Sequence, residues 1–307
     1  MRIAVMATGA VGGYFGARLA QAGHEVAFMA RGGQLEALCR YGLRVQSPLG
    51  DMHLPRVEAT DDPATIGPVD LVLFTVKLWD TEAAAEAVKP LLGDETAVVS
   101  FQNGVVKDDI LRQTLGAEHV IGGACYIAAT LSEPGFVRHS GTLQKLLFGE
   151  YDGSVSPRVR QFHDACAESG IDGEISDRIE QAIWEKFVFL VGLSGVTSLA
   201  RSPIGPIRSH PRARAFLHDV MEEAVKVARA QGAPLAADYA DDRVAFIDRL
   251  PASMTSSMLR DLDEGNRLEV AWLSGDVCER GARLDVPTPC NRAICDILSI
   301  HSAGRAK

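Results

Sequence analysis

The chain begins MRIAVMATGAVGGYFG over residues 1–16. Residues 3–7 form the short apolar run that is typical of a buried parallel strand, and Gly9, Gly12 and Gly16 then lead into a predicted helix. A tight glycine turn between a strand and a helix N-terminus is typical of a domain that binds a dinucleotide. This stretch therefore predicts a Rossmann-type domain at the start of the chain.

The glycine turn indicates how such a domain would hold its ligand. Glycine at position 9 lets the backbone approach a pyrophosphate, and glycine at position 12 lets the helix pack closely on the strand. The unpaired N–H groups and the positive dipole end at the start of the helix attract the anion. We therefore expect cofactor contacts from the residues of the turn, which are Ala7, Thr8, Gly9, Ala10, Val11 and Gly12.

Ala7 departs from the usual three-glycine pattern, because it occupies the position of the first glycine and the motif reads A-x-G-x-x-G. That position lies in the tight turn, where the wide range of backbone angles open to glycine is useful. Alanine fits there only if its φ stays negative, so the sequence predicts a negative φ at Ala7.

Arg31 ends the second predicted strand, VAFMA over residues 26–30. A chain that binds NAD usually carries Asp or Glu there, to accept a hydrogen bond from the ribose 2′-hydroxyl. A cation suits a 2′-phosphate instead, and Gly32 and Gly33 leave room beside it, so we expect NADP(H) as the cofactor. The alternative is that Arg31 is a solvated loop residue and the glycines form a purely structural turn.

Length and composition are consistent with an enzyme of the ordinary soluble type. Its 307 residues, of which 47% are hydrophobic, suffice for two domains with sizeable cores. The formal net charge of −9 argues against nucleic acid as a partner and gives no general attraction for an anionic substrate. We expect no membrane association and a cytoplasmic location, because no long uncharged apolar run and no leader stand out.

The six cysteines show neither a CxxC motif nor a metal-like spacing with histidine. We expect them to be reduced, mostly buried thiols, and we expect no metal site.

The two halves of the sequence differ in pattern. Up to about Gly149, apolar strands alternate with helices, with strands expected over 3–7, 26–30, 70–76, 97–101 and 120–127 and a final pair of strands around 136–149. From Ser156 onward the pattern is helical, with helices expected over 157–169, 177–199, 211–231, 238–248, 257–281 and 288–302. We predict an α/β Rossmann-like domain with a mostly parallel sheet over residues 1–153 and an all-helical domain over residues 154–307.

Polar residues at the carboxyl ends of the predicted strands are candidates for ligand contacts, because ligands bind outside those ends in such sheets. Lys77 follows one strand and is either the first solvated loop residue or a contact to cofactor or substrate. Asn103 follows the next strand, before Gly104. It is either a turn residue or an amide that hydrogen-bonds to a ribose or a substrate carbonyl.

In the helical half, Lys186 comes one residue before a long apolar stretch. It is either a surface lysine whose stem covers neighbouring aromatic rings or a partly desolvated ammonium that protonates an oxygen. Ser257 and Glu269 lie more than three turns apart on the helix expected over 257–281, and their positions alone do not mark them as functional.

These residues together resemble the ketopantoate reductase (2-dehydropantoate 2-reductase) family, over essentially the whole chain. The resemblance rests on the order of several short motifs, each of which is weak alone. They are GAVGGYFG over 9–16 with Arg31, VK at 76–77, QNG at 102–104, the segment 122–129, PG at 134–135, WEK at 184–186, and SSMLRD over 256–261 followed by Glu269.

The resemblance implies NADPH-dependent reduction of a 2-oxo acid to a 2-hydroxy acid, most directly 2-dehydropantoate to pantoate in pantothenate biosynthesis. It implies that Lys186 is the general acid and that Asn103 contacts both cofactor and substrate. The remaining implied roles are cofactor contacts for Lys77, the Ala129 backbone and Glu269, and a substrate contact for Ser257. A homodimer is compatible with this assignment.

Three positions depart from the family pattern. The family usually carries asparagine four and eight residues after the lysine, where this chain has Leu190 and Ser194 in the expected substrate site, and Ile204 replaces a third asparagine. Leucine cannot make the hydrogen bond of an amide, and a site that binds a hydroxyl discriminates strongly through such bonds. A different, more apolar or larger 2-oxo acid is therefore an alternative substrate.

Two further readings stay open. The chain could be an NADP-binding sensor that has lost catalysis, which would account for an altered substrate pocket. It could also be a related two-domain dehydrogenase of the opine or 6-phosphogluconate kind, which would oxidise a hydroxy acid or use an amine co-substrate.

Overall fold

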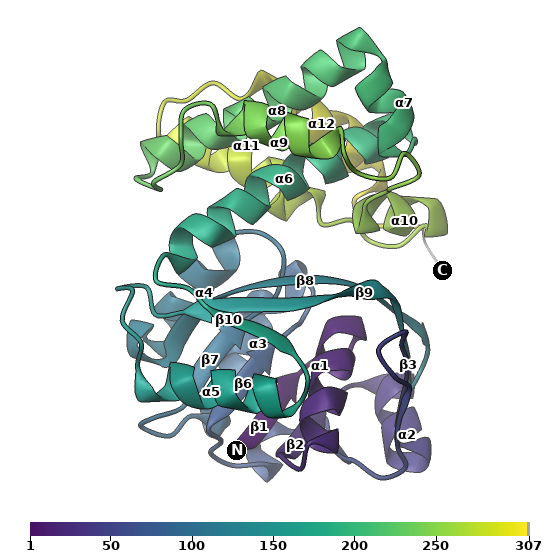
Figure 1. Ribbon diagram of the computed structural model, residues 1–307, viewed down its shortest axis with the longest axis vertical. Coiled ribbons are helices and arrows are strands. Elements are labelled where there is room, and N and C mark those ends of the chain that lie inside the picture. The colour runs from purple at the N-terminus through teal and green to yellow at the C-terminus, as the bar shows by residue number, and fades with distance from the viewer. Residues whose placement is uncertain (306–307) are drawn as a thin grey trace. The chain divides into compact units, whose positions relative to one another are not determined.

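The computed structural model describes residues 1–305, which fold into two compact units (Figure 1). Unit 1 comprises Met1–Asn103 with Lys107–Ala182, and unit 2 comprises Gly104–Val106 with the chain from Ile183 onward. The predicted boundary between residues 153 and 154 remains a prediction. The helix and the strand that follow it, α5 (Pro157–Glu168) and β10 (Asp172–Ile175), lie in unit 1, because β10 pairs with β9 (Phe136–Gly149).

Unit 1 is built on a ten-stranded sheet in the order β4-β3-β9-β8-β7-β6-β1-β2-β5, with β10 beside β9. The pairs from β5 to β8 are all parallel, and β8 then turns back into β9 as an antiparallel hairpin. The remaining strands are β1 (Arg2–Met6), β2 (Glu25–Met29), β3 (Leu43–Gln46), β4 (Met52–Leu54), β5 (Glu58–Thr60), β6 (Leu71–Phe74), β7 (Ala97–Ser100) and β8 (Val120–Glu133).

Helices pack against both faces of this sheet. On β1, Ile3 and Val5 join the core formed with α1 and α5, whereas Ala4 and Met6 join the core formed with α3 and α4. This alternation explains why an all-apolar strand is stable, since both of its faces are buried. The helices of unit 1 besides α5 are α1 (Ala10–Gln21), α2 (Gly32–Tyr41), α3 (Thr81–Ala87) and α4 (Val106–Leu115), with single 3-10 turns at Pro63–Thr65, Leu78–Asp80, Lys89–Leu91 and Ala117–His119.

The first five predicted strands and the mostly parallel sheet are confirmed, whereas the pair of strands predicted around 136–149 is one long strand, β9. Four short strands, β3, β4, β5 and β10, were not predicted from the sequence. Each has only three or four residues, and β10 reads DGEI, with no apolar run to reveal it. The expectation that residues 154–307 contain only helices is wrong at β10, which is stabilised by its ladder with β9 rather than by local propensity.

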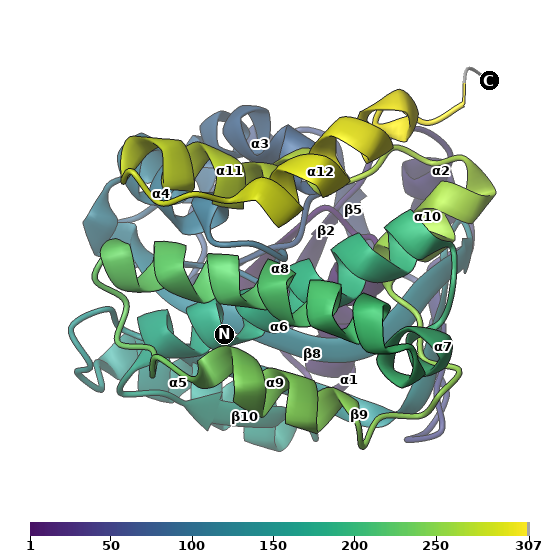
Figure 2. The same ribbon diagram turned by 90° about the horizontal axis from the view of Figure 1, so that it is seen from above.

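Unit 2 is helical, as predicted (Figure 2). Helix α8 packs on α9, and α11 packs on α12. The helices are α6 (Ile179–Ala200), α7 (Ile204–Ser209), α8 (Pro211–Ala230), α9 (Tyr239–Ile247), α10 (Ser257–Glu264), α11 (Ser274–Arg283) and α12 (Pro289–Leu298), with 3-10 turns at Val270–Trp272 and Ser299–His301.

The single helix predicted over residues 257–281 is wrong. Helix α10 ends at Glu264, and Gly265 follows in the left-handed conformation with a φ of +72°. Glycine adopts that conformation at little cost and commonly ends a helix in this way. Ser257 and Glu269 therefore belong to different segments of chain, and their separation along one helix no longer applies.

Helix α6 is long and apolar enough to span a membrane by length and composition alone. Its most apolar window is 67% buried within the structure, as expected for the core helix of a globular unit. Apart from α6, no helix in residues 1–305 meets that test of length and composition.

Candidate cofactor and active site

The carboxyl ends of four strands bring several predicted site residues to one edge of unit 1. Strands β2, β1, β6 and β7 are neighbours and run parallel. Ala7, Arg31, Lys77 and Asn103 each follow one of these strands within three residues, so they lie along the same edge. Strand β1 pairs with β2 on one side and with β6 on the other, so the order of the strands reverses at β1. Sheets of this kind bind their ligands beside such a point of reversal.

The turn after β1 differs from its prediction, because Ala7 has a φ of +73° rather than a negative φ. The hydroxyl of Thr75 donates to the Ala7 carbonyl at 2.8 Å, and the Thr8 backbone N–H donates to the Met29 carbonyl at 2.7 Å. A left-handed alanine costs about 1–2 kcal/mol. Contacts from the two neighbouring strands therefore hold a conformation that local preference opposes.

The N-terminus of α1 fits the pyrophosphate of a dinucleotide. Gly9 caps the helix with no side chain bound to it, and no acidic residue lies in the first turn. A Cβ added at Gly9 would meet nothing within 4 Å, whereas one at Gly12 would lie 2.6 Å from the Ala7 carbonyl oxygen. Gly9 thus leaves open space at the uncapped amides, and Gly12 is required by close packing, as the sequence predicts.

Arg31 lies at the N-terminus of α2, where it is exposed. Within residues 1–305, its side chain makes no hydrogen bond or ion pair with the protein. Gly32 has a φ of +52°, and a Cβ on Gly33 would reach only the Cγ atom of Pro134, at 4.0 Å. A guanidinium beside a helix N-terminus and two small residues could bind a phosphate dianion.

Gln34 was missed by the sequence analysis. Its side-chain amide donates to the Thr8 carbonyl at 2.8 Å, and its amide oxygen accepts from the Gly135 N–H at 2.8 Å. One side chain on α2 therefore joins the glycine turn to the turn of the β8–β9 hairpin. No local pattern reveals this role, because the two partners lie 26 and 101 residues away in sequence.

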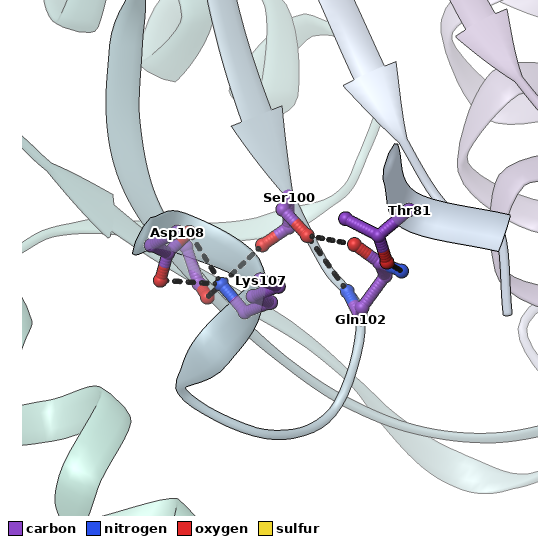
Figure 3. Close-up of polar contacts among 6 residues, drawn as sticks. Thr81, Ser100, Gln102, Lys107 and Asp108 are labelled. Carbon is purple, nitrogen blue, oxygen red and sulfur yellow. Dashed lines mark hydrogen bonds and ion pairs between the residues drawn. The ribbon is translucent and has the colours of Figure 1, made fainter. Parts of the chain in front are cut away.

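A buried polar chain fixes the loops that carry Lys77 and Asn103 (Figure 3). The hydroxyl of Ser100 donates to the amide oxygen of Gln102 at 2.9 Å, and the Gln102 amide donates to the hydroxyl of Thr81 at 2.9 Å. Thr81 donates in turn to the backbone of the 3-10 turn that follows Lys77. The end of β7 and the end of β6 are thereby held in register.

Lys77 is exposed, with its ammonium 5.6 Å from the centre of the Trp79 ring, and Asn103 is half-buried.

Lys107 and Asp108 form a buried ion pair beneath the loop between β7 and α4 (Figure 3). The Lys107 ammonium donates to both Asp108 oxygens, at 2.8 and 2.7 Å, and to the carbonyls of Ser100 and Gly123, both at 3.2 Å. Burial raises the pKa of Asp108, although the Lys107 ammonium acts in the opposite direction. The lysine thus ties β7 to β8 at the point where Asn103 leaves the sheet.

Ala129 lies on β8 beyond the part that pairs with β7, which ends at Ile121. Because β7 and β8 are parallel, the rest of β8 continues past the carboxyl edge of the sheet. A shift in register with β9 separates Ile127 from Ala129, and Ala129 is half-buried. Its backbone therefore lies in an irregular part of the hairpin, beyond the edge of the sheet where the ligand contacts are predicted.

In unit 2, Lys186, Leu190 and Ser194 lie on one face of α6, because they are spaced by four residues. Lys186 and Leu190 are half-buried, and Ser194 is 3% exposed. Ile204 is fully buried at the start of α7. This face of α6 thus carries, in order, the cation of Lys186, the aliphatic side chain of Leu190 and the buried hydroxyl of Ser194.

Ser257 and Glu269 differ in their surroundings. Ser257 is exposed at the first position of α10, whereas Glu269 is 8% exposed before the 3-10 turn at 270–272. The preceding residue, Ser256, caps α10 through the Leu259 N–H and shares a 2.9 Å hydrogen bond with the hydroxyl of Thr197 on α6. The start of α10 is therefore anchored one turn beyond Ser194 on α6. Ser256 has the sequence signal of a helix cap, which the sequence analysis did not use.

No group of three or more His, Cys, Asp or Glu side chains suited to a metal ion occurs within the described part of the chain.

Two family models match the sequence. The model for ketopantoate reductase PanE/ApbA matches residues 3–153, and the model for the C-terminal part of ketopantoate reductase PanE/ApbA matches residues 178–302.

Relatives resemble the chain over its full length. An oxidoreductase of Bacillus subtilis called YkpB is 30% identical over 306 residues, covering 99% of both chains. A 2-dehydropantoate 2-reductase of Halobacterium salinarum is 32% identical over 303 residues, covering 98% of both.

Solved structures share the fold. A PanE/ApbA family ketopantoate reductase from Ralstonia eutropha superimposes with a TM-score of 0.89 at 34% identity, covering 98% of both chains. A D-mandelate dehydrogenase in complex with NADH and anilino(oxo)acetate also has a TM-score of 0.89 and covers 98% of both chains, at 20% identity. At that identity the likeness shows the fold alone.

Proposed function

Because the chain belongs to the ketopantoate reductase PanE/ApbA family, we propose that it reduces a 2-oxo acid to a 2-hydroxy acid with NADPH. The observation that carries the proposal is the face of α6 on which half-buried Lys186 lies one and two turns before Leu190 and Ser194. A half-buried ammonium beside an aliphatic side chain is suited to give a proton to a developing alkoxide.

The proposed cofactor residues are those of the sheet edge in unit 1. The amides from Gly9 to Gly12 would hold the pyrophosphate, and Arg31 with the N-terminus of α2 would hold the 2′-phosphate. Further contacts are proposed from Ala7, Thr8, Ala10, Val11, Lys77, Asn103, the Ala129 backbone and Glu269. NADPH, when bound, supplies the hydride that reduces the carbonyl carbon.

The chain's own residues supply the proton and the orientation. We assign to Lys186 the donation of a proton from its ammonium to the carbonyl oxygen as that oxygen gains charge. General acid catalysis of this kind is worth roughly a hundredfold to ten-thousandfold in rate. Asn103, Ser194 and Ser257 are assigned hydrogen bonds to the substrate, and Leu190 an apolar contact with its side chain.

Lys186→Ala tests the assignment of the general acid. We expect kcat to fall at least a hundredfold, because no other proton donor is assigned, while the Kd for NADPH changes little. Lys226→Ala is the matched control, since this lysine is exposed on α8 and forms an ion pair with Glu222 one turn away. Turnover like that of the wild type in Lys186→Ala would contradict the assignment.

The proposed substrate is 2-dehydropantoate, supported by the name of the Halobacterium salinarum relative. Leu190 favours a competing 2-oxo acid with a more apolar side chain, because the position offers no hydrogen bond to a substrate hydroxyl. NADPH oxidation against 2-dehydropantoate and a panel of aliphatic and aromatic 2-oxo acids decides between them. Leu190→Asn is expected to shift the ratio of kcat/KM toward 2-dehydropantoate by about tenfold, the worth of one such hydrogen bond.

The same assay distinguishes the proposed reductase from the two alternative functions. Tight NADPH binding without turnover of any 2-oxo acid would favour an NADP-binding sensor. Activity only with an amine co-substrate, or only in the direction of hydroxy-acid oxidation, would favour an opine or 6-phosphogluconate type of dehydrogenase.

A further inference from the structure

Two cysteines of unit 2 lie on helices α11 and α12, which carry none of the residues assigned above. Cys278 lies on α11 and Cys295 on α12, two helices that pack on each other, and each thiol is the largest influence on the pKa of the other. Both are free thiols, and both line a cavity of about 550 Å³. The rest of the cavity is lined by Gly275, Glu279, Ala282, Arg283 and Arg292.

The cavity gives the thiols access to solvent. Glu279, Arg283 and Arg292 on its rim are exposed, whereas Cys295 is half-buried and Cys278 is only 3% exposed. A small polar molecule can therefore reach the pair through a charged opening. A bulky reagent is less able to do so.

The surroundings favour a thiolate at Cys278. The neighbouring Cys295 thiol is the largest influence and lowers the pKa of Cys278 to about 7, with help from Thr288 and the Arg292 charge and against the effect of burial. The pKa of Cys295 is raised, first by Cys278 and then by burial, and its thiol lies 4.0 Å from the Val270 carbonyl oxygen. A low-pKa thiol beside a second thiol is the arrangement of a peroxide-sensitive pair.

Charged groups face the pair from three helices. Glu279 and Arg283 lie on α11, Arg292 on α12, and Glu223 on α8. Glu223 raises the pKa of Cys278, but its carboxylate already accepts the backbone N–H groups of Cys290 and Asn291, at 2.7 and 2.9 Å. Among these charged groups, Arg292 therefore has the largest effect on the pKa of Cys278, and it favours the thiolate.

We propose that Cys278 and Cys295 form a modification site for small hydroperoxides, at which the two thiols are oxidised to a disulfide between α11 and α12. The Cys278 thiolate attacks one peroxide oxygen, so that an S–O bond forms and the O–O bond breaks. The sulfur is oxidised to a sulfenic acid, and the peroxide is reduced to an alcohol or water. The Cys295 sulfur then attacks Cys278, and the S–O oxygen leaves as water with the thiol proton.

The test uses the full chain, first reduced and then treated with hydrogen peroxide at pH 7. Peptide mapping without reductant is expected to find an intramolecular disulfide between Cys278 and Cys295. In Cys295→Ser, dimedone is expected to label Cys278 as a sulfenic acid. Cys278→Ser is expected to yield no disulfide involving Cys295.

Cys290 is the matched control in the unmutated chain, because it is half-buried on the same helix as Cys295 and burial raises its pKa to about 12. With iodoacetamide at pH 7, Cys278 is expected to react at least tenfold faster than Cys290, because far more of it is thiolate. Oxidation confined to Cys39, which is exposed, or reaction of Cys290 as fast as Cys278, would overturn the proposal.

Discussion

At the scale of single residues, the glycine turn shows how far a motif can be altered without loss of its backbone shape. Alanine stands where glycine is usual, yet Ala7 keeps the positive φ of a glycine. The turn is held by hydrogen bonds from Thr75 and by Thr8, whose N–H and hydroxyl both donate to the Met29 carbonyl. The strain at Ala7 is therefore offset by neighbouring strands rather than avoided.

Ala7→Gly is expected to stabilise the protein slightly. The change relieves about 1–2 kcal/mol of left-handed strain, and the greater freedom of glycine in the unfolded chain offsets about 0.4–1 kcal/mol. Urea unfolding should then show a gain of between about 0 and 1.6 kcal/mol. Ala215→Gly, at an exposed position within α8, is the control and is expected to lose about 0.5–1 kcal/mol. A comparable loss in Ala7→Gly would show that the turn is not strained.

At the scale of elements, the structure joins segments that are distant in the sequence through single polar side chains. Gln34 connects α2 to both the glycine turn and the β8–β9 hairpin, and the chain from Ser100 through Gln102 to Thr81 connects the ends of β7 and β6. Each connection lies at the edge of the sheet where the proposed cofactor residues gather. The loops of the proposed site are thus held by the elements that flank them.

Gln34→Ala is expected to weaken NADPH binding severalfold while leaving kcat largely unchanged, because the side chain positions the Thr8 carbonyl and takes no part in proton transfer. The loss of two hydrogen bonds should also cost about 1–3 kcal/mol of stability. Gln34→Glu, which cannot donate to Thr8, should reproduce the loss of affinity. Gln113→Ala on the exposed side of α4 serves as the control. An unchanged KM for NADPH in Gln34→Ala would rule out the positioning role.

Glu150 connects the end of β9 to α5. Its carboxylate accepts from Arg158 through two bonds of 2.8 Å and from Ser156, the N-cap of α5, at 2.6 Å. Burial raises the pKa of Glu150, but the hydrogen bonds from Arg158 and Ser156 outweigh it, so the pKa lies below its ordinary value. The ionised form therefore stabilises the fold above the unfolded pKa, and this contribution is lost as pH falls through the folded pKa.

Glu150→Gln should accordingly lose about 1–2 kcal/mol at pH 7. The difference from the wild type should shrink as the pH falls below the ordinary glutamate range, because the wild-type carboxylate becomes protonated. Urea unfolding at a series of pH values measures this. Glu58→Gln, at an exposed carboxylate on β5, is expected to change little at any pH. If the difference in free energy of unfolding between the wild type and Glu150→Gln were the same at every pH, the ionisation of Glu150 would not be its cause.

At the scale of the whole molecule, the candidate residues divide between two units with separate cores. Unit 1 carries the predicted cofactor residues of the sheet edge, and unit 2 carries Lys186, Leu190, Ser194, Ser257 and Glu269. The two family models match residues 3–153 and 178–302, and the segment between them, which contains α5 and β10, belongs to unit 1. A cofactor that binds only the folded protein stabilises it by mass action, by about 2.7 kcal/mol at a hundredfold excess over Kd.

Arg31→Ala is expected to remove most of the thermal stabilisation by NADPH and to raise the KM for NADPH far more than that for NADH. The reason is that only NADPH carries the 2′-phosphate assigned to this guanidinium. Arg40→Ala removes the same charge from the other end of α2 and should leave the preference intact. Equal effects of Arg31→Ala on the two cofactors would contradict the assignment of NADP.

The sequence by itself determined the strand–turn–helix at the N-terminus, the alternating α/β first half, the helical second half and the family. These features follow from local periodicity and short motifs, which can be recognised without knowing which distant segments of the chain they contact. It did not reveal β10, the break at Gly265, the positive φ of Ala7, the role of Gln34 or the meeting of Cys278 and Cys295. Tertiary structure decided each of these, because each depends on hydrogen bonds or packing between segments far apart in the chain, which can override local preference.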